Sequence, residues 1–327
     1  MILVSGATGF LGHHLIPLLV KNGYNIRALV RPTSNVDFLL EHGVELAYVE
    51  DISDRSGVMQ ACAGCTEVIH AAGQFRFWGD WSEFWQTNVE GTAAVLEAAV
   101  AADVKRFIHV STIAVAGKIE RGQVIDEQFP CEPQDGYQMT KYQGEQLVLE
   151  YHQTHQLPVV VVRPGAFYGP WGRYAFNRLF FEEPLRGWRI RVDKGERITF
   201  PVYAADVATG VLLALQKGRA GEVYNICGYP FTHNECNRLV SNLAGISHWR
   251  MNMPKWAVLS LAYAWTALSR YTGREPFYPI NLRLYVFQDW NVSIEKAKAE
   301  LGFEPTPFTT GAQATLEWYY EQGILKK

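Results

Sequence analysis

Residues 2 to 12 read Ile2-Leu3-Val4-Ser5-Gly6-Ala7-Thr8-Gly9-Phe10-Leu11-Gly12, a short apolar run followed by three glycines at intervals of three. Apolar residues then recur at helical spacing from residue 15 to 19. A strand that enters a helix through such a turn brings backbone N–H groups and the positive helix end close to a pyrophosphate. This stretch predicts a dinucleotide site, and a tight strand-to-helix turn without chemical purpose is the alternative. The candidate contacts are Gly6, Thr8, Gly9, Phe10, Leu11 and Gly12.

Strand and helix patterns alternate through the first half of the chain. Apolar runs at 2–4, 26–30, 44–49 and 67–70 are separated by helical patterns near 12–22, 34–42 and 55–62. Parallel strands joined by helices are the expected outcome, with helices on both faces of the sheet. We therefore expect an α/β fold: a doubly wound parallel sheet of the Rossmann type with a smaller, mainly helical C-terminal substrate region.

Composition excludes several classes of function. The net charge of −3 over 327 residues gives no signal for nucleic acid binding. The longest charge-free apolar stretch of the later chain, 256–268, is shorter than the roughly 20 residues that span a bilayer, and no leader precedes the glycines. Five scattered cysteines predict neither disulfides nor a metal site. We expect a cytoplasmic protein that binds a small-molecule substrate and no metal or nucleic acid.

The end of the second expected strand bears on the choice of cofactor. An acidic residue about 20 residues after the glycines would bind the ribose 2′-hydroxyl of NAD. Arg31 stands there instead, and no Asp or Glu occurs between Lys21 and Asn35. A guanidinium suits a 2′-phosphate, so NADP(H) is favoured and NAD(H) stays possible. The alternative is an Arg31 that only faces solvent.

Two later segments carry groups suited to hydride chemistry. Residues 106–115 read as a fifth strand with hydroxyls at its end, and Tyr137 and Lys141 lie four apart on one helix face. A phenol has an unperturbed pKa near 10, and a nearby cation favours its ionised form. Such a pair can pass a proton while a nicotinamide passes a hydride. The pattern predicts an oxidoreductase.

The ordered set GATGFLG (6–12), HAAG (70–73), NVEGT (88–92), VST (110–112) and YQMTK (137–141) resembles the extended short-chain dehydrogenase/reductases of the NAD-dependent epimerase/dehydratase superfamily. Within that superfamily the chain looks most like the dihydroflavonol reductase and 3β-hydroxysteroid dehydrogenase branch. The resemblance covers the first 230 residues closely and the remainder more loosely.

The resemblance implies a catalytic role for several residues. Tyr137 would be the acid/base, and Lys141 would lower its pKa and bind the nicotinamide ribose. Thr112 lies where the catalytic Ser or Thr of the family usually falls, so it is preferred to Ser111. Only one of the two can serve, because neighbours in a strand point to opposite faces. Asn88 would support a proton relay; the alternative is an amide that stabilises a helix.

The same resemblance extends the expected cofactor site. Asp51 would face the adenine amino group, although a helix cap is an equally natural use of it. His70 is expected to be structural rather than catalytic. The remaining expected cofactor contacts are Ile52, His70, Ala71, Ala72, Gly73, Val110, Pro164, Gly165 and Phe167.

By the same resemblance, residues 1–165 plus 203–228 form the NADP-binding Rossmann domain, and 166–202 plus 229–327 the substrate-binding region. An aromatic loop, 74–81, follows the fourth strand, where ligands of open α/β sheets bind. It is either a substrate wall or a packed surface cluster. The candidate substrate contacts are Phe75, Phe77, Trp78, Thr112, Tyr168, Trp171, Arg173 and Phe176.

The arginines and aromatic residues of the substrate region indicate the class of substrate. Sugar-nucleotide enzymes of the family usually carry a phosphate-binding Arg where this chain has Thr199, although Arg197 and Arg283 could replace it. Aromatic residues make up 13% of the chain, and flat walls suit ring systems or acyl chains. We expect interconversion of a ketone and a secondary alcohol on a hydrophobic substrate that is sterol-like, flavonoid-like or 3-oxoacyl. The alternatives are a nucleotide-sugar epimerase or dehydratase with tightly bound NAD, and a non-catalytic dinucleotide sensor.

Two expectations concern surfaces. The helix expected at 254–269 would be a buried or lid helix, or would lie against a membrane surface as a peripheral contact. The resemblance further implies a homodimer that pairs through the helices carrying Asn88 and Tyr137.

Overall fold

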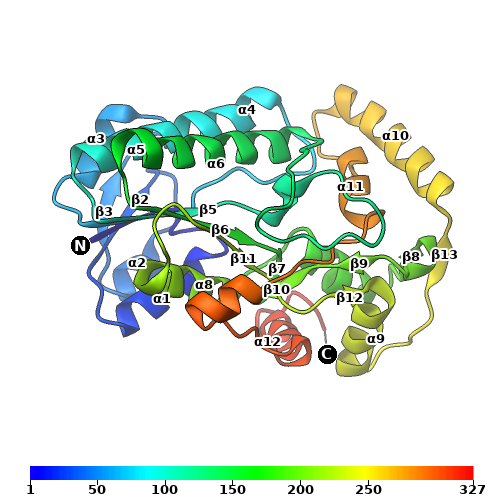
Figure 1. Cartoon of the computed structure of the whole chain (residues 1–327). Helices are drawn as coiled ribbons and strands as arrows, with labels where there is room; N and C mark the ends of the chain where they lie inside the picture. Colours follow the sequence, from blue (N-terminus) through cyan, green and yellow to red (C-terminus); the bar gives the residue numbers. More distant parts are fainter. Residues whose placement is uncertain (327) are drawn as a thin grey trace.

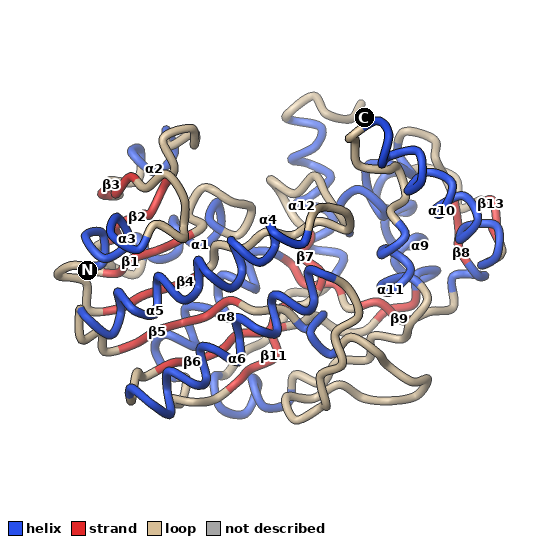
Figure 2. The backbone as a smooth tube through the Cα atoms, turned by 90° about the horizontal axis from the view of Figure 1, so that it is seen from above, coloured by secondary structure: helices blue, strands red, loops and turns tan. Residues whose placement is uncertain are grey.

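The computed structural model describes residues 1–326, and in it seven strands form one parallel sheet in the order β11-β6-β5-β4-β1-β2-β3 (Figures 1 and 2). The strand order reverses between β1 and β4, which places the ligand crevice of a doubly wound sheet beside these two strands. The expected fold class is confirmed. The sheet strands are β1 Ile2–Ser5, β2 Ile26–Val30, β3 Glu45–Tyr48, β4 Glu67–His70, β5 Arg106–Val110, β6 Val159–Pro164 and β11 Val223–Ile226.

Helices cover both faces of the sheet because side chains alternate along each strand. In β1, Leu3 packs into a core with α3, α5 and α6, whereas Ile2 and Val4 pack into a second core with α1 and α8. Figure 1 shows these two layers above and below the sheet. The helical elements of this half are α1 Gly12–Lys21, α2 Asp37–Glu41, α3 Arg55–Cys62, α4 Trp81–Trp85, η1 Gln86–Glu90, α5 Gly91–Ala101, η2 Ile113–Ala116, α6 Gly136–His155 and α8 Ala204–Lys217.

The turn between β1 and α1 requires glycine at two positions. Gly6 has φ of 73°, and a Cβ there would lie 2.7 Å from the backbone nitrogen of Ala72. A Cβ at Gly12 would lie 1.9 Å from the carbonyl oxygen of Ala7. Glycine therefore lets the turn approach both the segment after β4 and its own helix.

The C-terminal region adds short strand pairs and helices beyond the carboxyl edge of the sheet. Strands β7 and β10 pair in parallel, as do β8 and β13, whereas β9 and β12 are antiparallel. These strands are β7 Ala166–Tyr168, β8 Ile190–Val192, β9 Ile198–Thr199, β10 Pro201–Tyr203, β12 Phe231–Thr232 and β13 Met251–Met253. The helical elements are η3 Arg178–Glu182, α7 Glu183–Leu185, η4 Asp193–Gly195, α9 His233–Ala244, α10 Lys255–Thr272, η5 Ile280–Leu282, α11 Arg283–Val286, η6 Ala297–Leu301 and α12 Phe308–Glu321.

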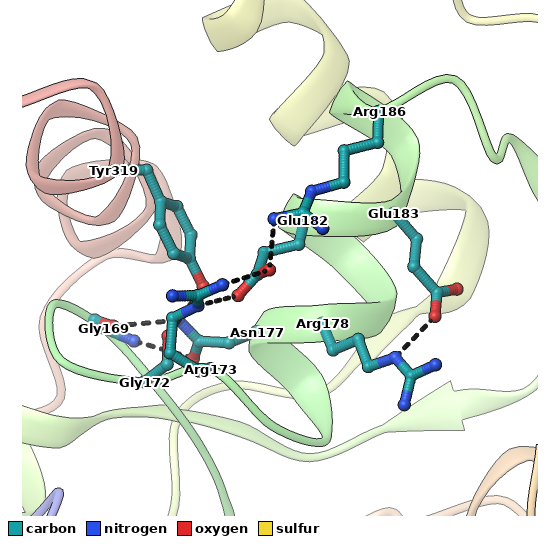
Figure 3. A network of polar contacts seen from close by, with 9 residues as sticks. All are labelled: Gly169, Gly172, Arg173, Asn177, Arg178, Glu182, Glu183, Arg186 and Tyr319. Carbon is teal, nitrogen blue, oxygen red and sulfur yellow. Dashed lines mark hydrogen bonds and ion pairs between the residues drawn. The ribbon is translucent and has the colours of Figure 1, made fainter. Parts of the chain in front are cut away.

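A polar network holds the loop after β7 against α12 (Figure 3). The Asn177 amide donates to the carbonyls of Gly169 (2.9 Å) and Gly172 (3.0 Å), and the Tyr319 hydroxyl also donates to Gly172 (2.7 Å). Arg173 pairs with the buried Glu182 at 2.6 Å. The loop that enters the expected substrate region is thus fixed by buried polar contacts.

The helix expected at 254–269 is present as α10 and ends at Thr272. In residues 1–326, no helix combines the length and apolarity needed to cross a bilayer. The expected substrate-binding region runs to residue 327, which lies outside the described residues.

Candidate active site

One cavity of about 900 Å³ runs along the carboxyl edge of the sheet, from the glycine turn to the aromatic loop after β4. It joins the segments that the sequence singled out as cofactor, catalytic and substrate sites. The expected site residues that line it are Gly6, Thr8, Gly9, Phe10, Leu11, Arg31, Asp51, Ile52, Ala71, Ala72, Gly73, Phe75, Phe77, Val110, Ser111, Thr112, Tyr137, Lys141, Pro164, Gly165, Phe167, Trp171, Arg173 and Phe176.

Five expected site residues do not line the cavity. Gly12 lies under the carbonyl of Ala7, and Tyr168 is buried in a third core against Phe308. The other three are His70, Asn88 and Trp78. His70 and Asn88 are held by neighbouring polar groups described below, and Trp78 is half-buried outside the lining.

The cofactor end of the cavity has the features that a dinucleotide requires. Helix α1 begins after Leu11 without a side-chain cap. His13 N and His14 N donate to the carbonyls of Gly9 (3.2 Å) and Leu11 (3.0 Å), whereas the N–H groups of Phe10, Leu11 and Gly12 have no hydrogen-bond partner among residues 1–326. Gly6 packs closely against the backbone of Ala71 and Ala72, and all three residues line this end of the cavity. Positive helix ends and free N–H groups bind phosphates. The residues present therefore fit a bound dinucleotide.

Arg31 and Asp51 line this end of the cavity from the ends of β2 and β3. Arg31 is exposed. Asp51 Oδ1 accepts hydrogen bonds from the Ser53 backbone nitrogen (2.9 Å) and hydroxyl (2.6 Å). The cap of α3 is instead Asp54, which accepts from Gly57 N at 3.1 Å. The helix-cap alternative for Asp51 is therefore wrong, and its carboxylate is part of the cavity wall.

Lys141 and Tyr137 project from one face of α6 toward the end of β5. The Lys141 ammonium donates to the Val110 carbonyl at 2.8 Å. Burial lowers the pKa of Lys141 to about 8, against the opposing effect of the Glu145 carboxylate. Burial raises the pKa of the Tyr137 phenol, and the Thr112 hydroxyl partly offsets this. The Tyr137 ring lies 4.7 Å from that of Phe75, at the junction of the cavity's two ends.

The two hydroxyls after β5 point in different directions. Ser111 Oγ donates to Glu145 Oε2 at 2.6 Å, and Glu145 also forms a buried ion pair with Arg163 at 2.5 Å. Thr112 lies close enough to Tyr137 to act on its pKa, while its Oγ1 accepts from Ala114 N at 3.2 Å. Strand alternation therefore separates a structural hydroxyl from one that faces the phenol.

Asn88 ties the start of the aromatic loop to α6. Its Oδ1 accepts from Gln74 N (2.8 Å), and its Nδ2 donates to the Gln74 carbonyl (3.2 Å) and to Thr140 Oγ1 (3.0 Å). Both atoms of the amide are thus used in contacts between protein segments. Asn88 positions the loop beside Lys141 from behind the cavity wall.

Two buried histidines lie behind the cofactor end. His70 contacts Ser5 Oγ through Nδ1 (2.7 Å) and Thr92 Oγ1 through Nε2 (3.0 Å). Burial and nearby Lys141 lower the pKa of His70 to about 3, so it is neutral at pH 7. His109, whose ring lies 5.4 Å away, has a pKa lowered by the same causes. The structural expectation for His70 fits this placement, and sequence reasoning missed His109 because a strand histidine carries no signal of its own.

The substrate end of the cavity has an aromatic wall with few charges. Tyr174 accepts a hydrogen bond from Phe77 N at 3.0 Å and donates to the Glu275 carboxylate. The ring of Phe77 lies 5.4 Å from Tyr174 and 5.1 Å from Tyr285. Sequence reasoning missed Glu275, because its partner is 101 residues away and no local pattern links them.

The arginines considered as phosphate ligands lie outside this wall. Arg197 pairs with Asp289 at 3.2 Å, whereas Thr199 lines the cavity. Arg283 is exposed and borders a separate, smaller cavity. Neither arginine lines the main cavity.

Comparison with known proteins agrees with this geometry. The model of the NAD dependent epimerase/dehydratase family matches residues 2–227. The chain is 33% identical over 307 residues to the 4-hydroxy-2-methyl-3-oxo-4-farnesyl-3,4-dihydroquinoline-1-oxide ketoreductase of Stigmatella aurantiaca, covering 92% of this chain and 90% of that protein. It is 28% identical to a putative dihydroflavonol 4-reductase of Synechocystis, covering 99% and 95%.

Solved structures of known proteins resemble this chain over almost its whole length. The crystal structure of gox2253 superposes with a TM-score of 0.85 at 30% identity, covering 100% of this chain and 99% of that chain. The dTDP-glucose 4,6-dehydratase DesIV of Streptomyces venezuelae, solved with NAD bound, has a TM-score of 0.79 at 26% identity, with coverages of 99% and 98%.

Proposed function

This chain belongs to the NAD-dependent epimerase/dehydratase family and is an enzyme of the extended short-chain dehydrogenase/reductase type; from that premise we propose that it uses NADP(H) to interconvert a ketone and a secondary alcohol on a hydrophobic substrate. The observation that carries this proposal is the position of Tyr137. Its phenol lies beside Thr112 at the junction of a dinucleotide cradle and an aromatic wall.

The proposed chemistry assigns one step to each group. The bound nicotinamide supplies the hydride. Tyr137 donates its proton to the carbonyl oxygen during reduction. Because its pKa is raised, the phenol stays protonated until negative charge develops on that oxygen. Thr112 donates a hydrogen bond to the same oxygen. The buried Lys141 ammonium holds positive charge beside the phenolate that remains.

The 2′-phosphate form of the cofactor is proposed from Arg31. An exposed guanidinium at the end of β2 lines the cavity where an acidic residue would bind the ribose of NAD. A guanidinium pairs with phosphate through charge-assisted hydrogen bonds. We assign residues 1–165 and 203–228 to this cofactor half, and 166–202 with 229–326 to the substrate half.

The hydrophobic substrate is proposed from the wall formed by Phe75, Phe77 and Tyr174. The pairing of Arg197 with Asp289 supports the same choice, because that arginine is not free to hold a pyrophosphate. The Stigmatella aurantiaca relative is named for a ketone on a ring system that carries a farnesyl chain. A ring ketone with an apolar substituent is the substrate class we propose.

The test is an NADPH oxidation assay on a panel of ring ketones and 3-oxoacyl thioesters, with UDP-glucose and dTDP-glucose conversion measured in parallel. Turnover of apolar ketones with NADPH is expected. Conversion of a sugar nucleotide without added cofactor would instead support the second candidate, an epimerase or dehydratase that retains NAD. The similarity to the DesIV dehydratase, whose structure contains NAD, is the observation that favours this candidate.

A further inference from the structure

Helix α10 stands at the outer edge of the C-terminal region, away from the central sheet (Figures 1 and 2). It runs from Lys255 to Thr272, and its sequence contains two basic residues and no acidic one. Nothing in the proposed reaction uses this helix directly.

The inner face of α10 is apolar and packs over a small cavity of about 70 Å³. Val258, Leu259 and Ala262 form its lining from α10. This small cavity shares walls with the main one through Leu179, Phe180, His233, Leu282 and Val286. The helix thus already has an apolar protein contact on one side.

The outer face is also apolar, and it is exposed. Trp256, Tyr263 and Tyr271 recur at helical spacing along one stripe and are 72%, 60% and 90% exposed. Leu268, beside this stripe, is 57% exposed. A helix that is apolar on both sides is normally covered on both. The outer face of α10 therefore lacks the cover that its composition requires.

Further exposed aromatic residues lie near α10. Trp188 is exposed, and its ring lies 6.0 Å from that of Phe277, which in turn lies 5.6 Å from Trp265 of α10. Trp249 and Met251, which lead into α10, are exposed as well. Exposed apolar patches of this kind mark protein or membrane contacts.

The residue types on this surface decide between those two occupants. Trp and Tyr are the residues enriched where proteins meet the headgroup level of a bilayer. Arg274, just beyond the C-terminal end of α10, is exposed and complements anionic lipids. Lys255 at the other end lies over the ring of Phe287, at 5.1 Å, on the side of the small cavity. The acid that follows Arg274, Glu275, accepts a hydrogen bond from Tyr174. An exposed helix without acidic residues thus matches a lipid surface in both polarity and charge.

We propose that α10 docks this protein on an anionic lipid bilayer, lying in the plane of the surface with Trp256, Tyr263 and Tyr271 at headgroup level. The small cavity lies under the inner face of the helix, on the side away from the bilayer.

The test is flotation of the purified full-length protein with phosphatidylcholine vesicles, with and without phosphatidylglycerol. The triple variant Trp256→Ser, Tyr263→Ser, Tyr271→Ser should bind the mixed vesicles at least about tenfold more weakly, because three buried aromatic contacts are lost. Arg274→Glu should weaken binding only to vesicles that contain phosphatidylglycerol. The matched control is Tyr48→Ser, an exposed tyrosine at the end of β3, which should bind like the wild type.

Two results would overturn the proposal. One is wild-type protein that stays with the unbound fraction on both vesicles. The other is a wild-type oligomer in solution that the triple variant dissociates while vesicle binding is unchanged; a second copy of the chain would then cover this face. NADPH binding by thermal shift checks that the variants fold. Because vesicle binding is measured without substrate, its outcome is independent of whether the proposed reaction is correct.

Discussion

The Ser111 hydroxyl donates a 2.6 Å hydrogen bond to Glu145, which leaves the next residue, Thr112, as the hydroxyl beside the Tyr137 phenol. Glu145 is buried with Arg163, which donates to both of its oxygens, and the Ser111 hydroxyl adds a third hydrogen bond to this buried carboxylate. One strand end thus supplies a structural group and a reactive group in consecutive residues.

This division predicts opposite phenotypes for the two hydroxyls. Thr112→Val should lower kcat by about 100-fold or more, because it removes a donor to the developing oxyanion. Ser111→Ala should retain most turnover and lose about 1.5–3 kcal/mol of stability, because it removes a bond to a buried carboxylate. Steady-state NADPH oxidation and urea denaturation of both variants provide the comparison. The reverse pattern would make Ser111 the reactive hydroxyl.

Removing the Tyr137 hydroxyl should abolish the reaction without affecting the cofactor. Tyr137→Phe keeps the ring that packs on Phe75 but loses the proton donor, so turnover should fall by about 100-fold to 10,000-fold. NADPH affinity, measured by fluorescence titration, should stay within about threefold of the wild type. Wild-type turnover in this variant would rule out the proposed acid/base.

The pKa of Lys141 predicts an alkaline limit for ketone reduction. Burial lowers this pKa to about 8, so the ammonium is present below pH 8 and is lost as the pH rises through it. Tyr137 has a raised pKa and stays protonated over the same range. At saturating NADPH, kcat/KM should therefore fall above about pH 8. Lys141→Met should be less active, and its kcat/KM should not show this fall above pH 8. A wild-type kcat/KM that stays constant up to pH 10 would contradict the role proposed for Lys141.

The parts of the fold that the sequence predicted are those determined locally. The glycine turn, the first four strands and the helix carrying Tyr137 and Lys141 each show their periodicity or turn chemistry within about a dozen residues. These segments meet at one edge of the sheet because the carboxyl ends of parallel strands do so. The elements of the cofactor end and their meeting at this edge could therefore be predicted from the sequence.

The contacts that the sequence could not predict join distant segments. Strand β11 pairs with β6 through residues about 60 positions apart, and the Tyr174 to Glu275 bond closes the substrate end over 101 positions. His70 and Asn88 matched motif positions, yet Ser5, Thr92 and Gln74 hold them behind the cavity. The exposed outer face of α10 likewise depends on what packs around it, and periodicity alone does not report that.

Buried neutral histidines predict a loss of stability in mild acid. Burial lowers the pKa of His70 to about 3 and of His233 to about 4, and that of His109 also falls well below its usual value. As the pH drops below about 6.5, the unfolded chain takes up protons that the folded chain does not, so the free energy of unfolding decreases. The decrease between pH 7.5 and 5.5 should be about 1.4 kcal/mol for each histidine.

His109 offers a clean test of this effect, because neither of its ring nitrogens has a hydrogen-bond partner among residues 1–326. His109→Phe keeps an aromatic ring in the core, and it should reduce the difference in unfolding free energy between the two pH values by about 1.4 kcal/mol. Urea denaturation at pH 7.5 and 5.5 measures that difference. The exposed His248→Gln should leave it unchanged, and equal acid sensitivity of His109→Phe and the wild type would show that His109 titrates normally.

Arg31 predicts the cofactor preference. Its guanidinium lines the cavity at the end of β2, and the pairing of a guanidinium with a 2′-phosphate is charge-assisted. Arg31→Glu removes that pairing and adds a repelling charge, so NADPH affinity should fall by at least about tenfold to 100-fold, which corresponds to the loss of one such hydrogen bond. NADH carries no 2′-phosphate, and its affinity should stay the same or rise, because a carboxylate at this position can accept from the ribose 2′-hydroxyl.

Fluorescence titration with both cofactors measures the ratio of the NADPH and NADH affinities. The exposed Arg121→Glu gives the same change in net charge away from the cavity and should leave both affinities unchanged. If Arg31→Glu lowers the affinities for NADPH and NADH equally, the guanidinium does not bind the 2′-phosphate. Another part of the cavity wall must then determine the cofactor preference.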